Sequence, residues 1–200
     1  MPATFRLARD TDAAGVLAIY APIVTDTAIS FELEPPTLED IGRRIARGEH
    51  WPFLVCAQDD DVLAYAYAVS FRDRPAYRFT VETTIYVAET ARRRGVARRL
   101  YRSLLACLEV QGYRRVVAGI TLPNVASVAL HESLGFRKCA HLERVGWKLG
   151  AWHDVGYWER PLLTEHGADP PAAEPRRASE LSTDPSFVLA LGSGLGALDR

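Results

Sequence analysis

The feature that most constrains this chain is a short apolar run followed by a basic, glycine-containing turn and then by a helical stretch. The run covers residues 83–87, and the turn reads Arg-Arg-Arg-Gly-Val-Ala over residues 92–97. This order predicts a strand, a tight turn and a helix whose first backbone amides have no partner within the helix. Those amides, the helix dipole and the nearby arginines predict an anion site that suits a diphosphate.

The arginines near this turn allow a second interpretation. Six of them fall within residues 92–102, namely Arg92, Arg93, Arg94, Arg98, Arg99 and Arg102. They can also form a solvated basic helix face or bind nucleic acid. The formal net charge of the 200-residue chain is only −1, and Tyr101 is the one aromatic residue among these arginines. Nucleic acid is therefore not the expected partner.

The rest of the composition is typical of a cytoplasmic globular protein. No apolar stretch approaches the roughly 20 residues of a membrane helix, and residues 1–14 lack the apolar segment of a secretory signal. The cysteines are widely spaced in apolar contexts, which predicts buried free thiols in a reducing compartment. The histidines outside the motifs show no metal-binding spacing, so no metal is expected. These residues are Cys56, Cys107 and Cys139, and His50, His141, His153 and His166.

Hydrophobic periodicity and turn residues predict alternating strands and helices. We expect strands at 5–7, 52–58, 62–71, 80–87, 115–120, 137–144 and 152–160. Helices are expected after Asp12, with a disturbance at Pro22, and at about 37–47, 96–111 and 126–134. This order implies a mixed sheet flanked by helices in a domain of residues 1–163. Residues 164–200 are expected to form a mostly disordered tail, in which the apolar stretch 187–191 is too short to fold alone and either packs on the domain or has no structural role.

Three motifs in fixed order resemble the GCN5-related N-acetyltransferase (GNAT) superfamily. They are residues 81–87 (VETTIYV), 92–97 (RRRGVA) and 122–136 (LPNVASVALHESLGF). The closing segment at 150–158 is similar to the phosphinothricin and methionine sulfoximine N-acetyltransferase branch, so the resemblance spans about residues 4–162. It implies an α/β (α+β) fold with a mixed, largely antiparallel sheet of six to seven strands and about four helices. It also implies a homodimer that uses acetyl-CoA as cosubstrate.

The resemblance assigns a set of residues to acetyl-CoA. The backbone amides from Arg93 to Arg98 would hold the pyrophosphate, and Gly95 and Ala97 must be small so that the phosphates can approach. The backbone of the strand would pair with the pantetheine arm, while Ile85 and Val87 can equally be core residues. Asn124 would contact the same arm or serve only as a turn residue. The full set is Ile85, Tyr86, Val87, Arg93, Arg94, Gly95, Val96, Ala97, Arg98, Asn124 and Ser133.

Glu82 is the candidate general base. An amine substrate arrives as an ammonium ion, which must lose a proton before its nitrogen can attack a carbonyl carbon. Alternatively, Glu82 forms only an ion pair with Arg72, Arg74 or Arg78. Burial would raise the pKa of this carboxyl and a nearby arginine would lower it, and the sequence leaves open which effect is larger.

His131 stands where the broad superfamily usually has tyrosine. The resemblance to the branch implies that it protonates the departing CoA thiolate or shares the role of base, although a lone helical histidine can also be structural. For the acceptor, the resemblance indicates Phe31, Arg72, Arg74 and Tyr77, while Arg72 and Arg74 can also be ordinary loop residues.

The motifs together predict direct acetyl transfer from acetyl-CoA to the α-amine of a small amino-acid-like molecule. Phosphinothricin or methionine sulfoximine are the analogues that the resemblance indicates. No cysteine accompanies a base motif that would suggest an acyl-enzyme. The alternatives are another amine, such as an antibiotic, a polyamine or a protein N-terminus, or a non-catalytic module that binds nucleic acid. A small molecule is the expected partner, without nucleic acid or membrane.

Overall fold

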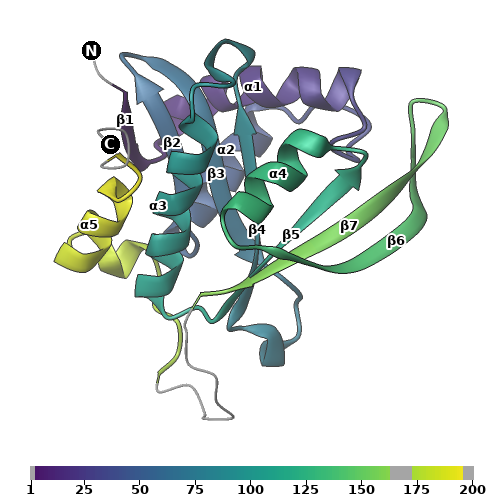
Figure 1. Cartoon of the computed structure of the whole chain (residues 1–200). Helices are drawn as coiled ribbons and strands as arrows, with labels where there is room; N and C mark the ends of the chain where they lie inside the picture. Colours follow the sequence, from purple (N-terminus) through teal and green to yellow (C-terminus); the bar gives the residue numbers. More distant parts are fainter. Residues whose placement is uncertain (1–2, 163–172, 196–200) are drawn as a thin grey trace.

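The computed structural model describes residues 3–162 and 173–195 and shows one seven-stranded sheet with helices on both faces (Figure 1). The strand order is β1-β2-β3-β4-β5-β7-β6, and the β4–β5 pair is parallel while the other pairs are antiparallel. This confirms the predicted mixed, largely antiparallel sheet. The strands are β1 (Thr4–Leu7), β2 (Phe53–Gln58), β3 (Asp61–Ser70), β4 (Thr80–Val87), β5 (Arg115–Leu122), β6 (Arg137–Lys148) and β7 (Ala151–Pro161).

Two apolar clusters fix the helices on opposite faces of the sheet. One cluster joins helices α1 and α2 to β2 and β3, and the other joins helix α3 to the opposite face, where α4 also packs. The helices are α1 (Ala13–Asp26), α2 (Leu38–Ala46), α3 (Val96–Gln111), α4 (Val125–Ser133) and α5 (Pro185–Gly192). Side chains alternate between the faces along β4, because successive residues of a strand point in opposite directions.

The helix termini follow the sequence signals with one exception. Thr37 and Asp40 form the predicted capping box of α2, and Gly112 ends α3 in the left-handed conformation with a φ of +96°. Helix α1, however, continues through Pro22 to Asp26, so the expected disturbance is wrong. Burial of Ile23 and Val24 in the α1–α2 cluster holds this last turn, although proline supplies no backbone N–H.

Strands β4 and β5 separate after a short stretch of pairing. Their ladder holds only three pairs and ends at Glu82 and Val117, whereas β4 continues to Val87. On the other side, β3 pairs with β4 as far as Val87. One edge of the β4 backbone beyond Glu82 therefore has no strand beside it, and an opening begins at this carboxylate.

Strands β6 and β7 form a long hairpin arm that extends beyond the rest of the sheet (Figure 1). Lys148 near its tip is only 4% exposed, and its Nζ donates to the carbonyl oxygens of Val24 and Ser30 at 2.6 Å each. Most of β6 is exposed, and Cys139 is exposed with it. The prediction of a buried thiol therefore holds for Cys56 and Cys107 but is wrong for Cys139, which lies in the exposed part of this strand.

The described part of the C-terminal segment is ordered, contrary to the expectation of a mostly disordered tail. Phe187 of α5 is 0% exposed and packs with Cys107 of α3 and with Leu181. Ser103 of α3 donates to the Leu191 carbonyl at 2.8 Å, so α5 lies against the outer side of α3. The expected domain boundary at 163–164 and His166 lie outside the described residues. None of the helices within 3–162 and 173–195 has the length and apolar character needed to cross a membrane.

Candidate active site

The basic turn after β4 has the geometry of an anion-binding helix start. Gly95 is the N-cap of α3, with a φ of +73°, a conformation that side chains other than glycine rarely adopt. The N–H of Arg99 is the first to bond within the helix, to the Gly95 carbonyl at 3.2 Å, so the preceding amides are free of helical partners. Apart from the adjoining residues of the turn and helix, no atom of the described residues lies within 4 Å of where a Cβ of Gly95 would stand. An anion can therefore approach the backbone closely.

The other residues assigned to the cofactor lie on β4, at the start of α3 and at the two ends of α4. Ile85 and Val87 pack on the α3 face, while Tyr86 packs on the α1 face with its ring 5.1 Å from that of Tyr20. The side chains of this strand are packed, while one edge of its backbone has no strand partner among the described residues and can pair with a ligand. Arg98 Nη2 donates to the Ser133 carbonyl at 3.4 Å, which places the start of α3 beside the end of α4.

Asn124 is the N-cap of α4. Its Oδ1 accepts from the Ser127 N–H at 3.1 Å, so the structural interpretation of this residue has a clear basis. Its side-chain NH2 group makes no hydrogen bond within the part of the chain that the structure describes. This group remains able to donate to a ligand.

Glu82 lies at the point where β4 and β5 separate, on the face that carries α1 and α2. Its Oε1 and the Tyr157 ring are so near Gly119 that a Cβ on that glycine would stand 3.3 Å and 3.5 Å from them. Burial raises the pKa of Glu82, and the positive charge of Arg72 lowers it by a smaller amount. Within the described residues Glu82 has no ion pair, and Arg78 pairs instead with Glu174 at 2.7 Å.

His131 lies on the opposite face of the sheet and is only 3% exposed. Its Nδ1 is 2.7 Å from the Ser127 carbonyl and its Nε2 is 3.2 Å from the Tyr101 hydroxyl. Tyr101 in turn contacts Thr83 Oγ1 at 2.6 Å. Burial lowers the pKa of His131, which favours the neutral ring. A neutral ring that donates from Nδ1 and accepts at Nε2 satisfies both contacts, so His131 links α4 through α3 to β4.

A pocket of about 470 Å³ lies beside Glu82 on its own face of the sheet. Thr80 and Val117, the neighbours of Glu82 along and across the strands, line this pocket, as does Tyr157. Two of the residues expected to bind the acceptor, Arg72 and Tyr77, also line it. The complete lining is Phe71, Arg72, Tyr77, Thr80, Arg115, Val117, Cys139, Ala140, Leu142, Tyr157 and Glu159.

The other two expected acceptor residues lie outside this lining. Arg74 is exposed on the connection between β3 and β4. Phe31 packs against the hairpin arm, with its ring 6.3 Å from that of His153 and directly over Gly146. Sequence reasoning missed Arg115, Tyr157 and Glu159. The alternation of Tyr157 and Glu159 is visible in the sequence, but the pairing of β5 with β7, which brings them beside Arg115, is not.

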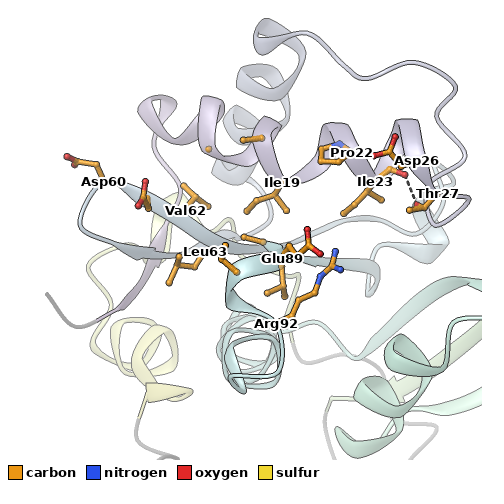
Figure 2. Close-up of a pocket in the computed structure, with 16 residues that line it drawn as sticks. Ile19, Pro22, Ile23, Asp26, Thr27, Asp60, Val62, Leu63, Glu89 and Arg92 are labelled. Atoms are coloured by element: carbon orange, nitrogen blue, oxygen red, sulfur yellow. Dashed lines mark hydrogen bonds between the residues drawn. The ribbon is translucent and has the colours of Figure 1, made fainter.

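A second cavity, of about 800 Å³, lies between α1 and the end of β4. Figure 2 shows Ile19 and Ile23 of α1 on one side of it, and Leu63 and Glu89 on the other. Arg92, the first residue of the basic turn, also lines this cavity. Glu82 itself is in the lining of neither cavity, but the lining of the 470 Å³ pocket includes its strand neighbours Thr80 and Val117, whereas this larger space adjoins the anion-binding turn.

Comparisons with known proteins agree with this geometry. The family model for the acetyltransferase (GNAT) domain matches residues 5–156. The phosphinothricin N-acetyltransferase of Streptomyces viridochromogenes is 39% identical over 163 residues, which cover 80% of this chain and 87% of that protein. The L-methionine sulfoximine/L-methionine sulfone acetyltransferase of Salmonella typhimurium is 33% identical over 82% of this chain and 97% of its own length.

A solved structure gives the same result. The GNAT superfamily phosphinothricin acetyltransferase from Sinorhizobium meliloti, in complex with AcCoA, superposes with a TM-score of 0.81 at 32% identity. The match covers 87% of this chain and 96% of that one. The fold, the motifs and these relatives lead to one conclusion: the chain belongs to the GNAT family and is an acetyltransferase.

Proposed function

We propose that this enzyme transfers an acetyl group from acetyl-CoA to the α-amine of a small amino acid of the phosphinothricin or methionine sulfoximine type. The observation that carries the proposal is the position of Glu82. This carboxylate lies where the free edge of β4 begins and beside a pocket whose lining includes Arg72. The names of the relatives support the substrate class.

Acetyl-CoA would supply the acetyl thioester, and the residues present suit its binding. The free amides that follow Gly95 would hold the pyrophosphate, together with the charges of Arg93, Arg94 and Arg98. The open edge of β4 over Ile85, Tyr86 and Val87 would pair with the pantetheine arm. The free amide group of Asn124 and the Ser133 region would line the other side of the opening.

Glu82 would accept the proton that the acceptor ammonium must lose. Burial raises its pKa, which makes it a stronger base than an exposed carboxylate, and the positive charge of Arg72 favours the ionised form. The amine nitrogen then forms a bond to the acetyl carbon as the carbon–sulfur bond breaks. The second amine proton leaves with the thiol, so the products are an N-acetyl amino acid, CoA thiol and one released proton.

His131 would act as a positioning residue rather than as a proton donor to the thiol. Both of its nitrogens are engaged, and it contacts Thr83 of β4 only through Tyr101. This buried chain fixes the part of β4 that carries Glu82. Glu82 is therefore assigned as the dominant base.

For the acceptor, Arg72 would bind the α-carboxylate and Tyr77 would form part of the wall. Arg74 would add positive charge at the rim, and Phe31 would cover the far end of the same face. A polyamine is disfavoured, because the lining contains the cations Arg72 and Arg115 and only the carboxylate of Glu159.

Two features support a homodimer in the cytoplasm. The hairpin arm exposes apolar side chains, of which Trp147 and Trp152 are 56% and 57% exposed, and a homodimer would bury them. The two buried free cysteines, Cys56 and Cys107, fit a reducing, cytoplasmic compartment.

The experiment measures N-acetyl product by mass spectrometry for a panel of amino acids and amines, and acetyl-CoA affinity by calorimetry. A readout by product avoids thiol reagents, which would also react with the exposed Cys139. Glu82→Gln should lower kcat on the order of 10²–10⁴-fold and leave the Kd of acetyl-CoA within about twofold. Equal loss of both, or product only from polyamines or proteins, would refute the proposal.

Glu109→Gln is the matched control for this variant. Glu109 is also a partly buried carboxyl whose pKa is raised by burial, but it lies on α3 facing Arg160 at 3.7 Å. This substitution should leave both kcat and the Kd of acetyl-CoA unchanged. A comparable loss of kcat in Glu109→Gln would mean that neutralising a partly buried carboxyl lowers kcat by destabilising the fold.

A further inference from the structure

The wall of the pocket beside Glu82 contains an ion pair that the proposed reaction does not use. Arg115 Nη1 of β5 lies 2.6 Å from Glu159 Oε2 of β7, and both residues line the pocket. The two side chains remain 43% and 27% exposed, so the pair faces the pocket space rather than the core. Glu159 is directly across from Val117, the strand neighbour of Glu82.

The pair changes the charge that the pocket offers to a ligand. The lining contains two cations, Arg72 and Arg115, and one carboxylate, Glu159. Arg72 has no carboxylate within ion-pair distance among the described residues; its guanidinium lies over the Phe71 ring at 4.1 Å. Since Glu159 pairs with Arg115, Arg72 is the cation of this lining that has no ion-pair partner among the described residues, and its charge acts on Glu82.

We propose that the Arg115–Glu159 pair selects acceptors by side-chain charge, so that the enzyme favours amino acids with a neutral polar side chain over those with an anionic one. This inference rests on the proposed function, in which Glu82 receives the α-amine and Arg72 the α-carboxylate. The acceptor side chain then extends along β5 and β7 toward the pair. A second anionic group would reach an arginine whose charge is already matched, next to the carboxylate of Glu159.

Two compounds isolate the effect of charge. L-Methionine sulfone and L-phosphinothricin have the same chain length and carry a methyl group and two oxygens on a tetrahedral sulfur or phosphorus. The phosphinate bears one negative charge and the sulfone bears none. The ratio of kcat/KM for the sulfone to kcat/KM for phosphinothricin therefore reports the charge preference with little contribution from shape.

The proposal fixes the direction of change in three variants. Glu159→Gln frees Arg115 and should lower the sulfone-to-phosphinothricin ratio on the order of tenfold, as expected for a unit charge within about 10 Å. Arg115→Gln leaves Glu159 unpaired and should raise the ratio by a similar factor. The double variant removes both charges and should return the ratio to within about threefold of wild type.

Arg137→Gln is the matched control. Arg137 is directly across from Glu159 on β6 but does not line the pocket. It should change the ratio by less than about twofold, because an exposed charge outside the pocket is screened by solvent. The proposal is overturned if Glu159→Gln leaves the ratio unchanged, if Arg137→Gln shifts it as much as Arg115→Gln, or if the double variant is not restored.

Cys139 offers a readout that does not require turnover. It lines the same pocket and is exposed, whereas Cys56 and Cys107 are buried. Each compound should protect Cys139 from iodoacetamide, with half-protection concentrations that follow the same order across the variants. Half-protection concentrations are compared rather than alkylation rates, because burial and the charge of Glu159 both raise the pKa of the Cys139 thiol, so a change at Glu159 would itself change the rate.

The two readouts separate failure of the inference from failure of the proposed function. If wild type acetylates neither compound but both protect Cys139, the proposed function is wrong, and the protection ratios still decide the charge inference. If both are acetylated and the ratios do not move, only the charge inference is wrong. If neither compound protects Cys139, the pair does not face the acceptor and the inference is refuted.

Discussion

Replacing Phe187 by alanine tests whether the C-terminal helix is part of the folded domain. The Phe187 side chain is 0% exposed and packs with Cys107, Ala178, Leu181 and Ala190. Removal of a fully buried phenylalanine loses the burial of its ring and leaves a cavity, which together lower the free energy of unfolding by about 3–5 kcal/mol. For a domain of this size, that corresponds to a fall in Tm on the order of 10 °C.

Urea unfolding followed by circular dichroism measures this change, and Leu189→Ala is the control. Leu189 is on the same helix but 76% exposed, so its replacement should change the unfolding free energy by less than about 0.5 kcal/mol. A loss below about 1 kcal/mol in Phe187→Ala at an unchanged m-value would contradict the packing argument. A reduced m-value would instead mean that α5 detaches separately from the rest of the domain.

Three further predictions concern Glu82, Gly95 and Lys148. Because burial raises the folded-state pKa of Glu82, this carboxyl stabilises the fold below its unfolded pKa and loses that contribution as pH rises through the folded value. Glu82→Gln should therefore have a Tm at neutral pH no lower than that of wild type, and it should lack the stability that protonation of Glu82 adds in acid. The acid limb of its kcat/KM profile should disappear. A loss of Tm at neutral pH would contradict this. Gly95→Ala should lower the free energy of unfolding by about 1–2 kcal/mol, because the φ of this residue is +73°. It should also weaken the binding of acetyl-CoA measured by calorimetry, and an unchanged affinity would exclude a close approach of the ligand to this residue. Lys148→Met removes two hydrogen bonds from a buried ammonium group and should lower the unfolding free energy by about 2–4 kcal/mol, and an unaltered urea midpoint would refute that role.

The sequence by itself determined the elements and their local ends. The apolar periodicity of residues 96–111 and the capping box at Thr37 and Asp40 depend on neighbours within one helical turn, so both were correctly predicted. Gly95 was identifiable from the local order of strand, turn and helix, and the structure adds that its φ is +73°. The alternation of side chains along the strand also placed Glu82 on the face opposite Val81.

Only the tertiary structure decided what these residues touch. The separation of β4 and β5, the pocket that joins Arg72 to Arg115 and Glu159, and the burial of His131 all depend on pairing between segments far apart in the chain. The order of residues 185–192 has the same origin: too short and apolar to be stable alone, this helix forms against the side of α3 that it covers. Burial and net pocket charge are sums over many chain segments, and no local pattern contains them.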